Sequence, residues 1–91
     1  MVVSAASAWE ISIKGARGKL DVPEDLLAAL ERDRIEKLPI TIEHATAAGS
    51  LPRHHDDPFD RMLIAQAQLE GLSLVTRDPR MLSYEVDIVP A

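Results

Sequence analysis

The stretch DPFDRMLIAQAQLEG, residues 57–71, carries the strongest structural signal in the chain. Asp57 is a typical helix-capping residue, Pro58 suits the first position of a helix, and Gly71 is typical of the position just beyond a helix end. Apolar residues recur between them at the spacing of a helix face. The stretch therefore predicts a helix that runs from Pro58 to about Glu70.

Helical and strand-like segments alternate on both sides of this helix. The patterns predict strands at residues 1–5, 37–41, 72–76 and 86–89, helices at 4–15, 21–33 and 41–52, and a turn at 78–82. Leu26, Leu27 and Leu30 form the predicted buried stripe of the second helix. Because strands separated by helices usually pair in parallel, we expect an α/β fold in which helices flank a parallel sheet.

Length, charge and composition restrict the class of protein. The chain has 91 residues and a formal net charge of −5, with no cysteine. The length allows one small domain, residues 1–91. The negative charge argues against an unaided nucleic-acid binder, but it does not exclude a nuclease whose bound metal offsets an acidic pocket. We expect no disulfides, no signal peptide and no membrane-spanning stretch, and we therefore predict a cytoplasmic protein.

Three acidic residues have the placement of a metal site. Glu10 follows the first predicted strand, Asp60 lies in the first turn of the strongest helix, and Asp78 follows a strand directly. Carboxylates at the carboxyl ends of parallel strands suit Mg²⁺ or Mn²⁺. Simpler interpretations stay open, because Asp60 also suits the helix dipole, Asp78 before Pro79 suits a turn, and Glu10 equally suits an exposed position on a helix.

Several polar residues near these acids are secondary candidates. The Thr76 hydroxyl lies at a strand end and is a possible metal or water ligand, although threonine is also an ordinary strand residue. Lys14 and Arg17 belong to a basic patch that either touches an RNA backbone or forms a solvated face. Arg61 and Arg77 flank the acidic positions, where they either hold phosphate or balance the acids.

The three histidines are predicted to be bystanders. His54 and His55 are adjacent, and neighbouring histidines rarely face the same ion, so we expect a solvated loop rather than a zinc site. His44, in a short helix, is expected to be a surface or half-buried residue.

Three longer segments together resemble the PIN-domain family. They are SAASAWEISIKGARGKL (4–20), HHDDPFDRMLIAQAQLEGLSLVTRD (54–78) and YEVDIV (84–89), in the order and spacing of that family. Among its members they are most similar to VapC-type toxins of bacterial toxin–antitoxin pairs. The resemblance covers nearly the whole chain, and the combination of segments is far more specific than any one of them.

The resemblance implies a metal-dependent endoribonuclease that uses Mg²⁺ or Mn²⁺. Glu10, Asp60 and Asp78 match the second, third and fourth acids of the family, and they would be both metal ligands and catalytic residues. Thr76 matches a polar position that is often beside the metal, and Asp57 is better interpreted as a helix cap. The resemblance also implies an RNA substrate, a cognate antitoxin and a homodimer.

One family feature has no counterpart in this sequence. Family members begin with a central strand that carries the first catalytic aspartate, whereas MVVSA matches their second strand. We therefore expect a partial PIN-like domain with an incomplete sheet, in which two half-sheets face a gap. Three explanations stay open: a start further upstream, a genuine truncation, or a gap filled by dimerisation or by a partner's strand. A truncated chain would be a catalytically inactive antitoxin-binding or interaction module instead of an active enzyme.

Overall fold

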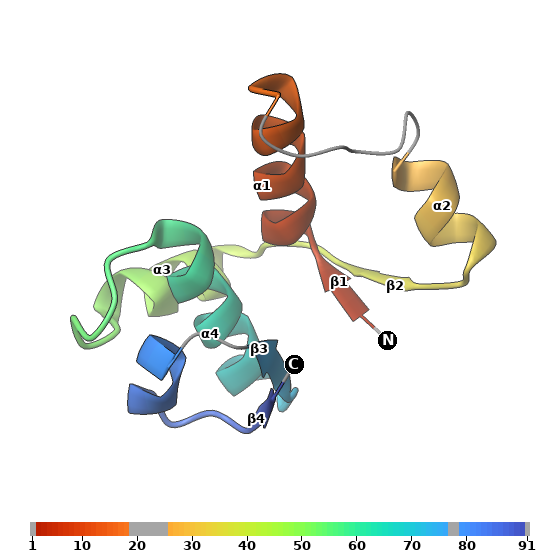
Figure 1. Cartoon of the computed structure of the whole chain (residues 1–91). Coiled ribbons are helices and arrows are strands. Elements are labelled where there is room, and N and C mark those ends of the chain that lie inside the picture. The colour runs from red at the N-terminus through yellow and green to blue at the C-terminus, as the bar shows by residue number, and fades with distance from the viewer. Residues whose placement is uncertain (1, 19–25, 77–78, 91) are drawn as a thin grey trace. The chain divides into compact units, whose positions relative to one another are not determined.

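The computed structural model describes residues 2–18, 26–76 and 79–90. These residues form four α-helices, four short strands and one 3₁₀ helix (Figure 1). The chain divides into two compact units, Met1–Pro39 and Ile40–Ala91. The mixed α/β class predicted from the sequence is confirmed.

The first unit contains β1 (Val2–Ser4), α1 (Ala5–Ala16), α2 (Leu26–Arg32) and β2 (Glu36–Leu38). The two strands pair in parallel, with Val2 opposite Glu36 and Ser4 opposite Leu38. Ser4 ends β1 and also caps α1, because its hydroxyl oxygen accepts the Ala6 backbone N–H at 3.0 Å. A single residue therefore sets the change from strand to helix.

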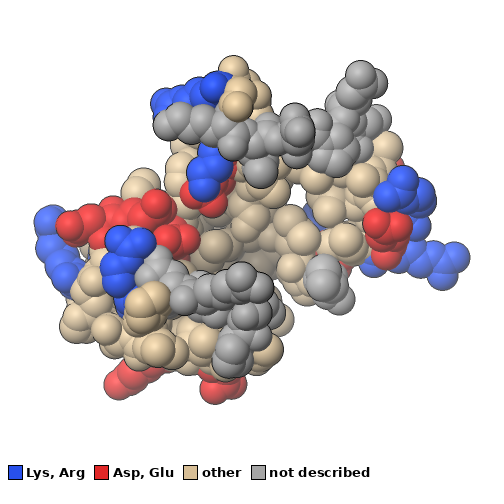
Figure 2. All heavy atoms as spheres, in the orientation of Figure 1, with Lys and Arg blue, Asp and Glu red and all other residues tan. Residues whose placement is uncertain are grey.

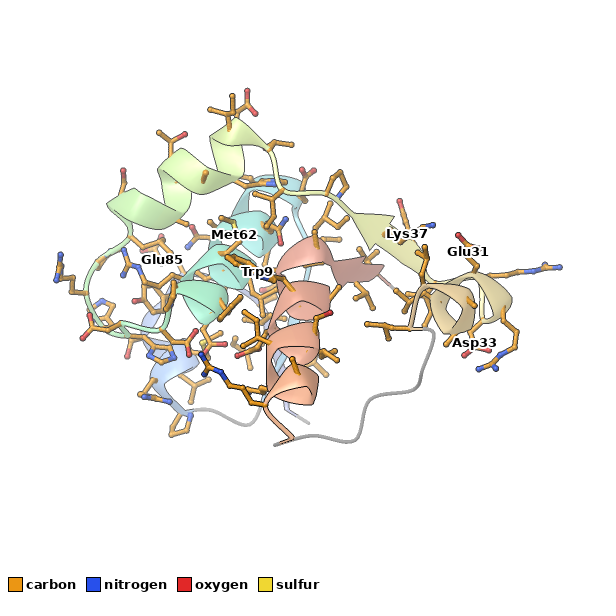
Figure 3. All side chains as sticks on the ribbon, turned by 90° about the horizontal axis from the view of Figure 1, so that it is seen from above. Trp9, Glu31, Asp33, Lys37, Met62 and Glu85 are labelled. Carbon is orange, nitrogen blue, oxygen red and sulfur yellow. The ribbon has the colours of Figure 1, made fainter. Side chains whose placement is uncertain are left out.

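An ion pair joins α2 to β2 on the surface of the first unit. The Lys37 ammonium lies 3.2 Å from a carboxylate oxygen of Glu31, and both side chains are more than half exposed (Figure 3). Exposed pairs of this kind stabilise a fold by at most about 1 kcal/mol. The pair connects α2 to the strand that follows it, but it contributes little to stability.

The second unit contains α3 (Ile42–Ser50), α4 (Pro58–Glu70), β3 (Leu74–Thr76), the 3₁₀ helix η1 (Pro79–Ser83) and β4 (Ile88–Pro90). Helices α3 and α4 pack against each other. Strands β3 and β4 pair in parallel, with Leu74 opposite Ile88 and Thr76 opposite Pro90. The predicted parallel pairing is confirmed in both units, and the described strands form two separate two-stranded sheets.

The predicted ends of α4 are confirmed residue by residue. Asp57 is the N-cap, and its carboxylate accepts the Asp60 backbone N–H at 3.0 Å. Pro58 occupies the first turn, and Gly71 ends the helix in the left-handed conformation with φ of 65°. Glycine is favoured there because a side chain at positive φ meets the backbone.

An aliphatic and aromatic cluster forms the core of the second unit. Ile64 of α4, Met81 of η1 and Tyr84 are buried at its centre, and partly buried apolar residues surround them: Leu51, Leu74, Val86 and Ile88. Ile64 has no exposed surface. Burial of a side chain of this size contributes about 1.5–3 kcal/mol. The core therefore joins α4, both strands of the sheet and η1.

Two predictions about the first half of the chain are wrong in detail. The expected buried stripe of α2 is not observed: Leu27 is 55% exposed, and none of the residues that form α2 is buried. The strand expected at 37–41 ends at Leu38, before Pro39. Proline has no backbone N–H to donate to a neighbouring strand, which explains why pairing stops there.

Within the described ranges, none of the helices has the length and apolar character that crossing a bilayer requires.

Candidate functional site

Asp60 is the candidate site residue that the structure describes most fully. It lies in the first turn of α4, where Asp57 fixes its backbone N–H. One carboxylate oxygen, Oδ2, lies 2.7 Å from Nε2 of His55, and the Asp60 side chain remains 26% exposed. The fold therefore holds one end of the carboxylate while leaving the group partly accessible.

His55 is buried, so the prediction of a solvated loop is wrong for this residue. Its side chain is only 3% exposed. An ionised carboxylate can only accept hydrogen bonds, which means that the His55 ring donates its Nε2 proton to Asp60. A donor–acceptor distance of 2.7 Å is in the range of charge-assisted bonds. The neighbouring His54 is exposed, and its ring packs edge-on against Tyr84 with centroids 5.1 Å apart.

The Arg61 guanidinium holds the chain between α3 and α4. Nη2 donates to the carbonyl oxygens of Ala48 and Leu51 at 2.8 and 2.9 Å. Nη1 donates to those of Pro52 and His55 at 3.1 and 3.2 Å. The last carbonyls of a helix have no partner within the helix, so Arg61 satisfies the end of α3 and fixes the path of the following loop.

Tyr84 also holds this loop. Its hydroxyl donates to the Pro52 carbonyl at 2.7 Å, with a longer contact of 3.4 Å to the His55 carbonyl. The backbone of His55 is thereby bound by Arg61 of α4 and by Tyr84, which follows η1. This double attachment determines where the imidazole lies relative to Asp60.

Glu10, Lys14 and Arg17 lie in the first unit. Glu10 is in α1, 26% exposed, and its carboxylate lies 3.4 Å from the ammonium of Lys14 one helical turn later. Arg17 is the exposed C-cap of the same helix. The face of α1 that carries the candidate acid therefore also carries positive charge, and Figure 2 shows charges of both signs on the face of the chain in view.

The remaining candidates are the last residue of β3 and the two residues that follow it in the sequence. Thr76 is the last residue of that strand, and Arg77 and Asp78 lie outside the described residues. The structure thus brings His55 together with Asp60, while Glu10 belongs to the other unit. In the part of the chain that the structure describes, no three His, Asp or Glu side chains gather closely enough to form a metal site.

His44 belongs to a second buried polar cluster, and the prediction of a surface or half-buried residue is wrong. It is 2% exposed, and its Nδ1 accepts the Thr41 backbone N–H at 3.0 Å. Nδ1 also lies 3.3 Å from the Gln66 side-chain amide, and Nε2 lies 2.9 Å from a Glu70 carboxylate oxygen. These bonds tie the start of α3 to α4, which gives His44 a structural role.

A polar cavity is lined mainly by the loop that carries His55. Its volume is about 300 Å³, and its lining residues are Arg53, His54, His55, Asp56, Asp57 and Arg80. The lining includes charges of both signs, so the cavity has no clear preference for an anion or a cation.

The described residues form two small α/β units with parallel strands, and in the second unit a buried histidine holds a carboxylate at the start of a helix. Residues 1–87 match the family model of the PIN domain. The chain therefore belongs to the PIN domain family. A comparison with curated proteins finds no match. Membership of this family indicates nuclease activity, RNA binding and a general dependence on divalent metal ions.

The chemistry of the candidate acids fits such a metal. Mg²⁺ and Mn²⁺ prefer carboxylate oxygens as ligands. Glu10 and Asp60 both carry carboxylates that are 26% exposed, so each is accessible to an ion. The hydrogen bond from His55 to Asp60 is of the kind that commonly orients a metal-binding carboxylate.

Proposed function

We propose that this protein is a metal-dependent endoribonuclease and the toxin of a toxin–antitoxin pair. Its membership of the PIN domain family supports nuclease chemistry. The observation that carries the proposal is the Asp60 carboxylate, held by His55 at 2.7 Å and still partly exposed. The similarity of its motifs to VapC-type toxins supports the more specific assignment.

Glu10, Asp60 and Asp78 would hold the Mg²⁺ or Mn²⁺ ion, with Thr76 beside them. When bound, such an ion supplies Lewis-acid chemistry that makes water a better nucleophile and offsets charge on the scissile phosphate. The three carboxylates would contribute the oxygen ligands of the ion. This assignment rests on residue chemistry and on the match to the family motif.

Basic side chains would bind the RNA backbone. Lys14 and Arg17 are exposed at the end of α1 and are suited to phosphate contacts, and Arg77 occupies the corresponding place after β3 in the sequence. Arg61 was a further candidate for this role. Because both of its terminal nitrogens already donate to carbonyls, we propose that Arg61 acts through the loop that carries His55.

The partners follow from the similarity to VapC-type toxins. A cognate antitoxin would cover the acidic site and prevent cleavage, and two copies of the chain would form a homodimer. We expect both proteins to act in the cytoplasm, where the RNA substrate is available. The role proposed for Asp60 in RNA cleavage requires neither the antitoxin nor a second copy of the chain.

The test is RNA cleavage by the purified chain. End-labelled single-stranded RNA is incubated with Mg²⁺ or Mn²⁺, with EDTA, and with the variants Asp60→Asn and Asp56→Asn. Asp56 is the matched control, because it is an exposed aspartate in the preceding loop. We expect cleavage to require the metal and to fall by about 100-fold or more in Asp60→Asn. Loss of a hydrogen bond to a metal ligand commonly costs about 10–100-fold in activity, and loss of the ligand itself should cost at least as much.

The proposal is wrong if cleavage is equally fast with EDTA, or if Asp60→Asn retains the rate of the Asp56→Asn control. A wild-type chain that is folded but cuts no RNA with either ion would also contradict it.

A further inference from the structure

We propose that His55 is a positioning residue that orients the Asp60 carboxylate for its ligand. The importance of this role for cleavage rests on the proposed function, but the geometric role can be tested without it. His55 would not bind the metal or the RNA itself. It would act by fixing one carboxylate oxygen of Asp60 and so setting the direction of the other.

The hydrogen bond between His55 and Asp60 runs from the ring to the carboxylate. Nε2 of His55 lies 2.7 Å from Oδ2 of Asp60. A carboxylate has no proton to give, so Nε2 is protonated and has no lone pair available for a metal. His55 is therefore unsuited to coordinate an ion through the nitrogen that faces Asp60. It is suited to hold the carboxylate.

The His55 ring is buried, whereas the Asp60 carboxylate is partly exposed. The His55 side chain is 3% exposed, whereas that of Asp60 is 26% exposed. Water therefore competes little for the imidazole side of the bond, while the carboxylate is accessible from outside. A hydrogen bond shielded in this way restricts a side chain more strongly than the same bond in solvent. The difference in exposure fits a support on the inner side and a ligand on the outer side.

His55 is itself held in place through its backbone. Its carbonyl oxygen lies 3.2 Å from Nη1 of Arg61 and 3.4 Å from the hydroxyl of Tyr84. Arg61 follows Asp60 directly in α4, and the Asp57 cap fixes the backbone of Asp60. Both ends of the His55–Asp60 bond are thus attached to the start of the same helix. A ligand would meet a carboxylate that is already ordered, which lowers the entropic cost of binding.

The test compares three substitutions at His55 with one at its exposed neighbour. His55→Leu removes the hydrogen-bond donor and replaces the ring with an apolar side chain of similar size. His55→Asn keeps a buried amide that is too short to reach Asp60, and His55→Gln places an amide near the position of Nε2. His54→Gln is the control, because His54 directly precedes His55 in the same loop but is exposed.

The first measurement needs no metal. Three-bond scalar couplings of Asp60 are measured by NMR in the isotopically labelled chain to report its χ1 angle. We expect a single rotamer in the wild type, in His54→Gln and in His55→Gln, and rotamer averaging in His55→Leu and His55→Asn. A merely structural role for His55 would lower the melting temperature without releasing Asp60, so the couplings separate the two roles.

The second measurement is Mn²⁺ affinity, determined by water-proton relaxation in the absence of RNA. Loss of an outer hydrogen bond to a metal ligand commonly weakens metal binding by about 10–100-fold. We expect a loss of this size in His55→Leu and His55→Asn, substantial recovery in His55→Gln, and wild-type affinity in His54→Gln.

The results discriminate between the two proposals. The positioning role is overturned if Asp60 keeps a single rotamer in His55→Leu, or in His55→Asn should the leucine variant not fold. It is also overturned if these variants bind Mn²⁺ as tightly as the wild type. A wild-type chain that binds no Mn²⁺ and cuts no RNA overturns the proposed function, and the Asp60 couplings then decide the positioning role alone.

Discussion

Replacement of Arg61 by alanine should strongly destabilise the second unit. The guanidinium donates to four carbonyl oxygens, at distances from 2.8 to 3.2 Å. Two of these acceptors, on Pro52 and His55, also lie within reach of the Tyr84 hydroxyl. The Ala48 carbonyl has a long second bond of 3.5 Å from the Leu51 N–H. The substitution therefore removes hydrogen bonds mainly from the carbonyl oxygens at the end of α3, on Ala48 and Leu51.

The expected loss follows from these partners. A hydrogen bond to a charged group contributes about 1.5–3 kcal/mol to stability. Because two acceptors keep a partner and Arg61 is only partly buried, we expect a total of about 3 kcal/mol rather than the sum over four bonds. For a domain of this size, that loss lowers the melting temperature by roughly 10–20 °C.

The assay is thermal and urea unfolding of Arg61→Ala, followed by circular dichroism. Arg53→Ala is the matched control, because Arg53 is an exposed arginine in the same loop. Arg61→Lys should lose most of the stability as well, since an ammonium cannot reach four carbonyls in a planar arrangement. If Arg61→Ala is as stable as Arg53→Ala but binds RNA less tightly, the structural role of Arg61 is refuted and a direct RNA contact is favoured.

Three further predictions concern the same unit. Ile64→Ala should lower the free energy of unfolding by about 2–5 kcal/mol, because it leaves a cavity in the core; a loss below about 1 kcal/mol in urea titration would contradict the packing described. Gly71→Ala should destabilise the fold by about 1–2 kcal/mol because its φ is 65°, whereas Gly49→Ala, within α3 and with open space around its Cβ, should stabilise it by up to about 1 kcal/mol. Thermal unfolding of the two variants checks that opposite sign. Finally, hydrogen bonds from its own backbone N–H and from the Thr41 hydroxyl lower the pKa of Glu43 below 4.5. The lowered pKa means that the ionised carboxylate supports the fold at neutral pH and that this contribution is lost as the pH falls through the folded-state pKa. Thr41→Ala should move the pKa back toward 4.5 in an NMR titration, and an unchanged value would exclude the hydroxyl as a cause.

Local signals in the sequence predicted the helices and the direction of strand pairing. The cap, the first-turn proline and the terminal glycine of α4 lie within a few residues of the helix that they define, so the sequence contains all the information about its ends. The α2 stripe shows the limit of such reasoning. Leucines spaced along one face indicate a surface that can be buried, but they do not supply a partner, and Leu27 remains exposed.

The buried histidines could not be distinguished by local signals. His54 and His55 are neighbours of the same type, and only one of them is buried. His55 is held partly by Tyr84, which lies 29 residues further along and whose hydroxyl contacts the His55 carbonyl. His44 is similar, since its partners Gln66 and Glu70 lie in another helix. Such distant contacts leave no periodic pattern in the sequence.

The candidate site was predictable in part. The placement of Asp60 after a capping Asp57 and Pro58 followed from the motif, and the structure confirms this local geometry. The roles of Glu10, Asp60 and Asp78 as metal ligands stay predictions. The support that His55 gives to Asp60 was missed, although the short separation of the two residues and the cap between them were visible in the sequence.

The unequal distribution of the core has a consequence for amide hydrogen exchange. Among residues 2–18 and 26–39, Ala6 is the only apolar side chain that is buried, whereas the second unit encloses Ile64, Met81 and Tyr84. Regions with few buried apolar contacts open at a lower free-energy cost than the core. Deuterium should therefore enter the amides of α1 and β1 through frequent local opening. It should reach those near Ile64 in α4 only through rarer and larger unfolding events.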